Sequence, residues 1–160
     1  MRARLYRWLI NLAPAYRRCG ARVTHISDDY KTVNIKLDLN WKTRNHLNMI
    51  WGGSLYSALD PIYGLMLHKI LGPDYYVVDK SAHIQFKRPA RDTVYGEFKI
   101  NSGEIDIIKE QCARHSKIER VYQLELTDKQ GKVHVMCEKT LHIRLASYGI
   151  KEQAKFITTL

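Results

Sequence analysis

Apolar positions change their spacing several times along the chain, and each change marks a new predicted element. Near the N-terminus four apolar residues recur with the spacing of one helix face, so Arg2–Leu12 is predicted to be an amphipathic helix that packs on the domain through this face. These residues are Leu5, Trp8, Leu9 and Leu12. The extended segments show the two-residue alternation of half-buried strands. They are Arg22–Ser27, Thr32–Leu39, Tyr75–Lys87, Thr93–Ile100, Lys117–Leu126 and Val133–Leu145.

A second helical segment differs from the first because it has no polar face. After the pair Gly52-Gly53 a helix of roughly 18 residues is predicted, ending at Leu71 before a Gly-Pro pair. Its apolar residues fall on all sides of the helical wheel, which predicts a helix that is buried all round. Pro61 should bend it, because proline has no N–H to donate. Another helix is predicted at Gly103–His115, and the tail Tyr148–Leu160 is weakly amphipathic.

The order of these elements is a helix, a hairpin, a buried helix and four further strands. A curved antiparallel sheet of about six strands, wrapped around a long central helix, buries that helix economically. This α+β arrangement, with the N-terminal helix beside it, is the hotdog fold. No repeat or linker indicates a second unit, so residues 1–160 are predicted to form a single hotdog domain.

Charge and cysteine content limit the setting and the partners. The formal net charge of +10 attracts anions, including the phosphates of coenzyme A or of an acyl carrier protein. Nucleic acid is disfavoured because the basic residues are dispersed and form no recognisable motif. A membrane surface is disfavoured because the apolar face of the first helix is expected to be buried. Three widely spaced cysteines indicate a reduced, cytoplasmic protein, and no Cys or His spacing predicts a metal.

One segment concentrates groups that suit thioester chemistry. A helix that begins at Gly52-Gly53 presents unpaired amides, so the Gly53 N–H can hold a thioester oxygen as it gains negative charge. Asp60 is a candidate general base or a candidate nucleophile, and the sequence leaves both open. Asn45 is a candidate for fixing the preceding loop or the attacking water. Purely structural roles in turns and hydrogen bonds are the alternatives for all of these residues.

The spacing of the two main groups predicts an assembly. Gly53 and Asp60 are separated by roughly 10 Å along one helix, at about 1.5 Å per residue. One thioester carbonyl can hardly touch both of them in a single subunit. Two such helices packed antiparallel about a two-fold axis bring Gly53 of one subunit to Asp60 of the other. We therefore expect a homodimer with two interface sites, and a tetramer built as a dimer of dimers is the next alternative.

Further candidates for substrate binding surround these groups. Gly52 adjoins the predicted oxygen-binding amide, and Trp51 and Tyr63 are candidate walls of an acyl groove between helix and sheet. Ser57 is a candidate for an auxiliary polar contact, with filling of the helix surface as the alternative. Three basic residues are candidates for binding the phosphates of coenzyme A or phosphopantetheine, with a solvated basic turn as the alternative. They are Lys87, Arg88 and Arg91.

These residues carry a resemblance to known families. The segment from Asn45 to Asp60 resembles the signature of the phenylacetic-acid-pathway branch of hotdog thioesterases, in which an Asn, a His-Gly-Gly and an Asp occur at this spacing. Asn45, Gly52, Gly53 and Asp60 match this signature. Trp51 stands at the His position, and Asn48 stands where a Gly is usual. Over nearly its whole length the chain resembles the DUF4442 family of uncharacterised hotdog proteins. The matching segments are Gly52–Leu55, Asp60-Pro61, Asp79–Phe86 and Arg88–Ala90.

The resemblance implies hydrolysis of acyl thioesters, either acyl-CoA or acyl-ACP. It implies no cofactor beyond the coenzyme A or phosphopantetheine that belongs to the substrate. The absent His leaves one alternative open, a non-catalytic protein that binds or senses acyl thioesters. A hydratase or dehydratase on the same fold is disfavoured, because such an enzyme normally uses a His together with the acid.

Overall fold

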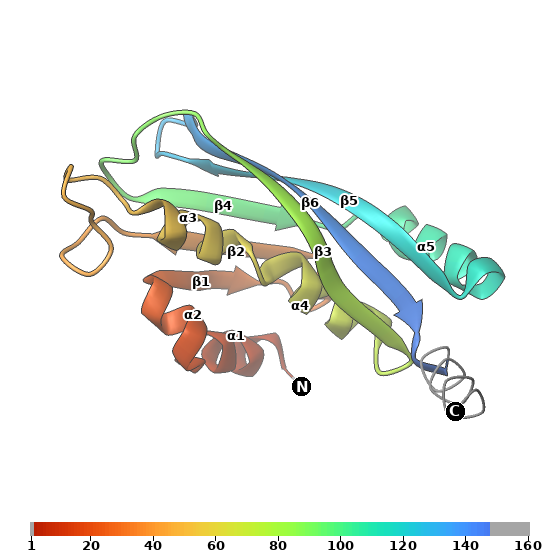
Figure 1. Cartoon of the computed structure of the whole chain (residues 1–160). Helices are drawn as coiled ribbons and strands as arrows, with labels where there is room; N and C mark the ends of the chain where they lie inside the picture. Colours follow the sequence, from red (N-terminus) through yellow and green to blue (C-terminus); the bar gives the residue numbers. More distant parts are fainter. Residues whose placement is uncertain (1, 148–160) are drawn as a thin grey trace, which may run out of the picture.

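The computed structural model describes residues 2–147, and Figure 1 shows how their helices and strands are arranged. The elements follow the predicted order, with boundaries close to the expected ones. They are α1 (Ala3–Leu12), α2 (Pro14–Cys19), β1 (Ala21–Ile26), β2 (Thr32–Leu37), α3 (Gly52–Leu59), α4 (Ile62–Leu71), β3 (Tyr75–Phe86), β4 (Val94–Lys99), α5 (Ser102–His115), β5 (Lys117–Thr127) and β6 (Val133–Leu145). The tail expected at Tyr148–Leu160 lies outside the described residues.

The six strands form one sheet in the order β1-β2-β4-β5-β6-β3. Every pairing in it is antiparallel, and the longer ladders join β6 to β5 and to β3. The sheet curves around α3 and α4, which lie along its concave side, while α1 and α2 lie beside β1 (Figure 1). This confirms the predicted α+β hotdog arrangement.

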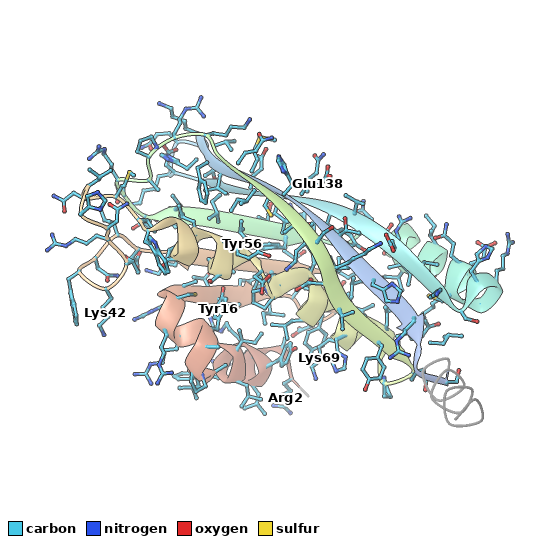
Figure 2. The ribbon with its side chains drawn as sticks, viewed as in Figure 1. Arg2, Tyr16, Lys42, Tyr56, Lys69 and Glu138 are labelled. Carbon is cyan, nitrogen blue, oxygen red and sulfur yellow. The ribbon has the colours of Figure 1, made fainter. Side chains whose placement is uncertain are left out.

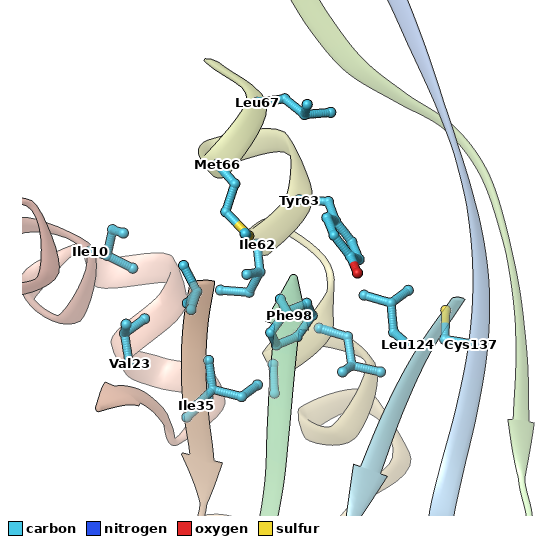
Figure 3. Close-up of a cluster of buried hydrophobic side chains, with 14 of the residues drawn as sticks. Ile10, Val23, Ile35, Ile62, Tyr63, Met66, Leu67, Phe98, Leu124 and Cys137 are labelled. Atoms are coloured by element: carbon cyan, nitrogen blue, oxygen red, sulfur yellow. The ribbon is translucent and has the colours of Figure 1, made fainter. Parts of the chain in front are cut away.

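The hydrophobic core lies between the central helices and the concave face of the sheet. Ile62 and Met66 of α4 are 1% and 2% exposed, and they belong to the same buried cluster as Ile35 of β2 and Phe98 of β4 (Figure 3). The Tyr63 ring packs edge-on against Phe98, with 5.5 Å between ring centroids. This packing keeps both helices close to the strands and so positions the residues between them.

The central helical segment is divided in two at Asp60-Pro61. α3 ends at Leu59 and α4 begins at Ile62, with Asp60 as the C-cap of the first helix and Pro61 as the N-cap of the second. Pro61 was expected to bend one continuous helix, and it ends α3 instead. The reason is that proline offers no N–H and its ring clashes with the preceding turn. The break therefore falls beside the residue for which catalysis is predicted.

One edge of the sheet, strand β1, is blocked by side chains of α1. The Asn11 amide donates to the Val23 carbonyl at 2.9 Å and accepts from the Val23 N–H at 2.8 Å. Arg7 adds a bond from Nη1 to the Thr24 carbonyl at 2.6 Å. These side chains pair with the edge as a neighbouring strand would, which leaves less of β1 open to another chain.

The apolar face of α1 does not pack on the domain, and this expectation was wrong. The contacts from Arg7 and Asn11 to β1 fix the rotation of the helix about its axis, so that Ala3 and Ile10 on another face are the residues it buries. The four residues of the predicted face are 49–61% exposed instead. They are Leu5, Trp8, Leu9 and Leu12, and we call them the α1 apolar stripe.

Candidate active site

The loop before α3 is held in shape by Asn45. Its Oδ1 accepts hydrogen bonds from the N–H groups of Leu47 at 2.9 Å and Met49 at 3.3 Å. Its own N–H donates to the Met49 carbonyl at 2.9 Å. These contacts are those of a residue that fixes the loop, which is one of the two roles predicted for Asn45. The other role, orienting an attacking water, stays a prediction.

α3 begins at the glycine pair without a capping side chain. Its N-cap residue is Trp51, whose side chain makes no capping hydrogen bond, so the helix itself leaves the first amides unsatisfied. Two aromatic rings crowd the pair. A Cβ added at Gly53 would lie 2.5 Å from Cη2 of Trp51, and one at Gly52 would lie 3.1 Å from Cζ of Phe86. Both rings are more than half exposed, so they form an accessible apolar border around these amides.

Asp60 is anchored by a buried lysine and stays accessible. Nζ of Lys139 donates to Oδ1 of Asp60 at 2.8 Å and also to the Asp60 backbone carbonyl. The Lys139 side chain is 1% exposed, whereas 42% of the Asp60 side chain is exposed. One carboxylate oxygen is therefore fixed from inside the protein, while the group as a whole can still be reached from outside.

The same ammonium group binds a second carboxylate. Oδ2 of Asp79 on β3 lies 2.9 Å from Nζ of Lys139. Asp79 pairs with Leu141 across the two strands, so it lies on the same face of the sheet as Lys139, and a β-bulge follows it between Asp79 and Ser81. We call Asp60, Asp79 and Lys139 the carboxylate–lysine cluster.

Two further ionisable groups border this cluster. Burial, then the charge of Asp60 and a hydrogen bond to it, raise the pKa of Tyr56 to about 12. The Tyr56 hydroxyl is therefore protonated at neutral pH and donates to the carboxylate. Burial also raises the pKa of the Cys137 thiol, which Lys139 opposes and Asp60 reinforces. A protonated thiol is a poor nucleophile, so Cys137 does not compete with Asp60 for that role.

The remaining helix residues lie in different surroundings. Gly53 and Asp60 are at opposite ends of α3, so a single chain does not bring them together. Tyr63 is 6% exposed, and its ring stacks on Tyr122 with 4.4 Å between centroids, inside the core. Ser57 is on the exposed side of α3. Contact of Ser57 or Tyr63 with a substrate stays a prediction.

The three basic candidates lie together after β3, close to the loop that leads into α3. Lys87, Arg88 and Arg91 are all exposed. Nη1 of Arg91 donates to the Leu47 carbonyl at 3.2 Å, which connects this segment to the loop that Asn45 holds. Nη1 of Arg88 donates to the Val133 carbonyl at 2.6 Å. Cationic groups are thus held near the start of α3, where an anionic end of a ligand can meet them.

Lys139 is the residue that our sequence reasoning missed. The buried positions of β6 recur at every second residue, and the alternation through Val135 and Cys137 continues to Lys139. A lysine on the inward face of an apolar strand requires a paired charge, because an unpaired buried cation is costly. That signal was present in the sequence and would have led to a search for its carboxylate partners.

Other features of residues 2–147 bear on the chemistry. No helix in this part of the chain is long and apolar enough to cross a membrane. In the same residues, no three His, Cys, Asp or Glu side chains are grouped to hold a metal ion. Cys19, Cys112 and Cys137 are free thiols.

Comparisons with known proteins identify a family and a fold. The family described as a domain of unknown function, DUF4442, matches residues 2–143. No curated protein matches significantly. A Pseudomonas aeruginosa protein of unknown function, described as a probable thioesterase, is similar at 22% identity and a TM-score of 0.81, over 91% of this chain and 97% of its own. A Haemophilus influenzae thioesterase is similar at 16% identity and a TM-score of 0.68, over 91% of this chain and 92% of its own. At these identities the similarity shows the fold.

Proposed function

The chain belongs to the DUF4442 family, and we propose that it hydrolyses acyl thioesters at sites formed between two copies of the chain. The observation that carries this proposal is the placement of Asp60. Its carboxylate is held by Lys139 at 2.8 Å and remains 42% exposed, at the C-terminal end of a helix that buries Leu55 and Leu59 in the apolar core. The thioesterase names of two structural neighbours are consistent with it.

The chemistry assigns one role to each group. Asp60 takes a proton from water, and the oxygen of that water attacks the thioester carbonyl carbon. The carbonyl oxygen becomes an oxyanion, which the Gly53 N–H of the second subunit stabilises. The carbon–sulfur bond then breaks, and the thiolate leaves with the proton that Asp60 had accepted. Direct attack by Asp60 to form an anhydride, followed by hydrolysis, is the alternative course.

The two edges of the sheet support a dimer through β3. β1 is blocked by α1, whereas β3 is an edge strand of 12 residues that is exposed along most of its length. A long open edge readily pairs with another strand. Antiparallel pairing of β3 with its copy about a two-fold axis would place both carboxylate–lysine clusters near the interface, because Asp79 lies close to the middle of the strand.

The surroundings of the site suit an acyl-CoA or an acyl carrier protein. The exposed rings of Trp51 and Phe86 offer apolar surface for an acyl chain. Lys87, Arg88 and Arg91 offer cations for the phosphates at the other end of the substrate. We propose the cytoplasm as the setting, because free thiols persist in reducing compartments.

The test is thioester turnover, followed as free thiol over a series of acyl-CoA chain lengths. We expect Asp60→Asn to lower kcat by at least about 100-fold, the loss typical of a removed general base. Asp79→Asn is the matched control, because it takes a carboxylate from the same ammonium group, and we expect it to cost less than about tenfold. Equal losses in the two variants would show that the cluster only maintains structure.

The second candidate is a protein that binds acyl thioesters without cleaving them. Trp51 favours it, because an indole stands where the thioesterase signature that this segment resembles has a His, and an indole can cover a bound ligand without acting as an acid or a base. Such a protein would bind acyl-CoA in equilibrium titrations and release no thiol. This candidate would be supported if wild type and Asp60→Asn both bind acyl-CoA and neither of them releases thiol.

A further inference from the structure

The N-terminal part of the chain is strongly basic. Residues 1–27 contain six arginines and no Asp or Glu. These residues build α1, α2 and β1, and Figure 1 shows the two helices beside β1, at the outer edge of the sheet. The arginines are Arg2, Arg4, Arg7, Arg17, Arg18 and Arg22. Five of them are exposed, and Arg7 is the half-buried one.

A broad groove continues this basic surface. It encloses about 1280 Å³ between α1, α2, β1 and the loop that follows β2. Trp8 and Trp41 line it and are 61% and 77% exposed, and Lys42 lies beside Trp41 with Nζ 5.0 Å from the ring centroid. Among the described residues that line the groove, Asp38 is the acidic one; it is 3.0 Å from Nζ of Lys36 and also interacts with the charge of Arg22. The groove therefore combines cations with amphipathic aromatic rings.

We propose that the face formed by α1, α2 and the loop after β2, which carries Trp41, binds the surface of an anionic phospholipid bilayer. The α1 apolar stripe is 49–61% exposed, which is a large apolar area for a helix in contact with water. A helix that lies in the membrane interface needs such a stripe, basic residues beside it and aromatic rings at the headgroup level. This face supplies all three. Figure 2 shows Arg2 and Lys42 on this lower side of the molecule, opposite Glu138.

Charge argues against one other occupant of this face, and the α1 apolar stripe argues against another. A second copy of the chain docked on the same face about a two-fold axis would set arginines against arginines, which costs free energy. A nucleic acid would satisfy the arginines but would leave the α1 apolar stripe in water. An anionic bilayer satisfies both kinds of side chain at once. The inference is independent of the proposed hydrolase, because Asp60 and Gly53 take no part in it.

The experiment is co-sedimentation of the full chain with vesicles of phosphatidylcholine, with or without about one third phosphatidylglycerol. We expect binding to the anionic vesicles alone, and weaker binding at high salt. Trp8→Ser with Leu9→Ser should weaken binding at least about tenfold, because exposed apolar area no longer inserts. Arg4→Ala with Arg18→Ala should weaken it about 25-fold, roughly fivefold for each arginine.

Matched controls use exposed residues away from this face. Ile107→Ser with Val121→Ser removes two apolar side chains that are 40% and 57% exposed. Lys109→Ala with Lys132→Ala removes the same charge as the arginine pair. Both pairs should bind vesicles within about twofold of wild type. Asp60→Asn should bind as wild type even if it has lost turnover, which separates this inference from the proposed function.

Three results would overturn the proposal. The first is no binding to anionic vesicles, as expected if an acidic protein is the partner of this face. The second is an equal loss of binding in the test and control variants, which would mean that total charge alone decides. The third is a larger assembly in solution that Trp8→Ser with Leu9→Ser dissolves, because a second copy of the chain would then cover the stripe. Melting temperatures of all variants exclude unfolding as the cause.

Discussion

Replacing Lys139 with Met tests the carboxylate–lysine cluster, because Met keeps most of the buried volume and removes the charge. Two carboxylate oxygens lie 2.8 and 2.9 Å from Nζ. Each attraction amounts to roughly 6 kcal/mol at an effective dielectric constant of about 20. Desolvation of the ammonium group offsets several kcal/mol of this sum. Asp60 and Asp79 are 42% and 38% exposed, so solvent screens both pairs, and we expect a net loss of about 2 kcal/mol in the free energy of unfolding.

The assays are urea unfolding and thermal unfolding of wild type, Lys139→Met, Asp79→Asn and the double variant. The melting temperature of Lys139→Met should fall by about 4–8 °C, the shift that corresponds to about 2 kcal/mol in a chain of this size. The double variant should recover part of the loss, because no carboxylate of Asp79 then remains without its partner. A loss below about 0.5 kcal/mol, or strictly additive effects, would refute the reasoning.

Two further predictions concern the β1 edge and alkaline pH. Asn11→Ala should lower the free energy of unfolding by about 1–2 kcal/mol and promote concentration-dependent self-association, because both backbone groups of Val23 lose a partner. Urea unfolding measures the first effect and sedimentation velocity the second. Unchanged values in both measurements would contradict the prediction. Folding raises the pKa of Tyr56 from about 10 to about 12, so its contribution to stability is present below about pH 10 and is lost as the pH rises to about 12. Tyr56→Phe should therefore show a shallower fall of stability over that range in urea unfolding, and identical slopes would exclude this role.

The fold could be predicted because periodicity reports directly on burial. Alternation located the strands, and the all-apolar segment after Gly53 located the central helices. What periodicity could not decide was how α1 rotates on the domain. The helix offers two apolar faces, and the polar bonds from Asn11 and Arg7 to the edge of β1 decide between them. Such bonds depend on where the edge strand lies in space, which no local pattern reports.

The candidate site could be predicted only where its residues are close together in the sequence. Asn45 and the glycines stand in one continuous segment with Asp60, so their spacing is readable along the chain. Lys139 is 79 residues from Asp60, and only the sheet brings the two together. Its inward position was readable from alternation, but the identity of its partners required the order of the strands.

The break at Asp60-Pro61 and the buried lysine form one structural unit. Because Pro61 ends α3, the helix has a C-terminal end inside the protein, and its last carbonyls and its partial negative charge need a donor there. A carboxylate at that end would add repulsion. Lys139 supplies both a hydrogen-bond donor and a positive charge, since its Nζ donates to the Asp60 carbonyl and to the Asp60 side chain. The chain can therefore place an accessible carboxylate at the negative end of a core helix only because β6 supplies a cation from the opposite side.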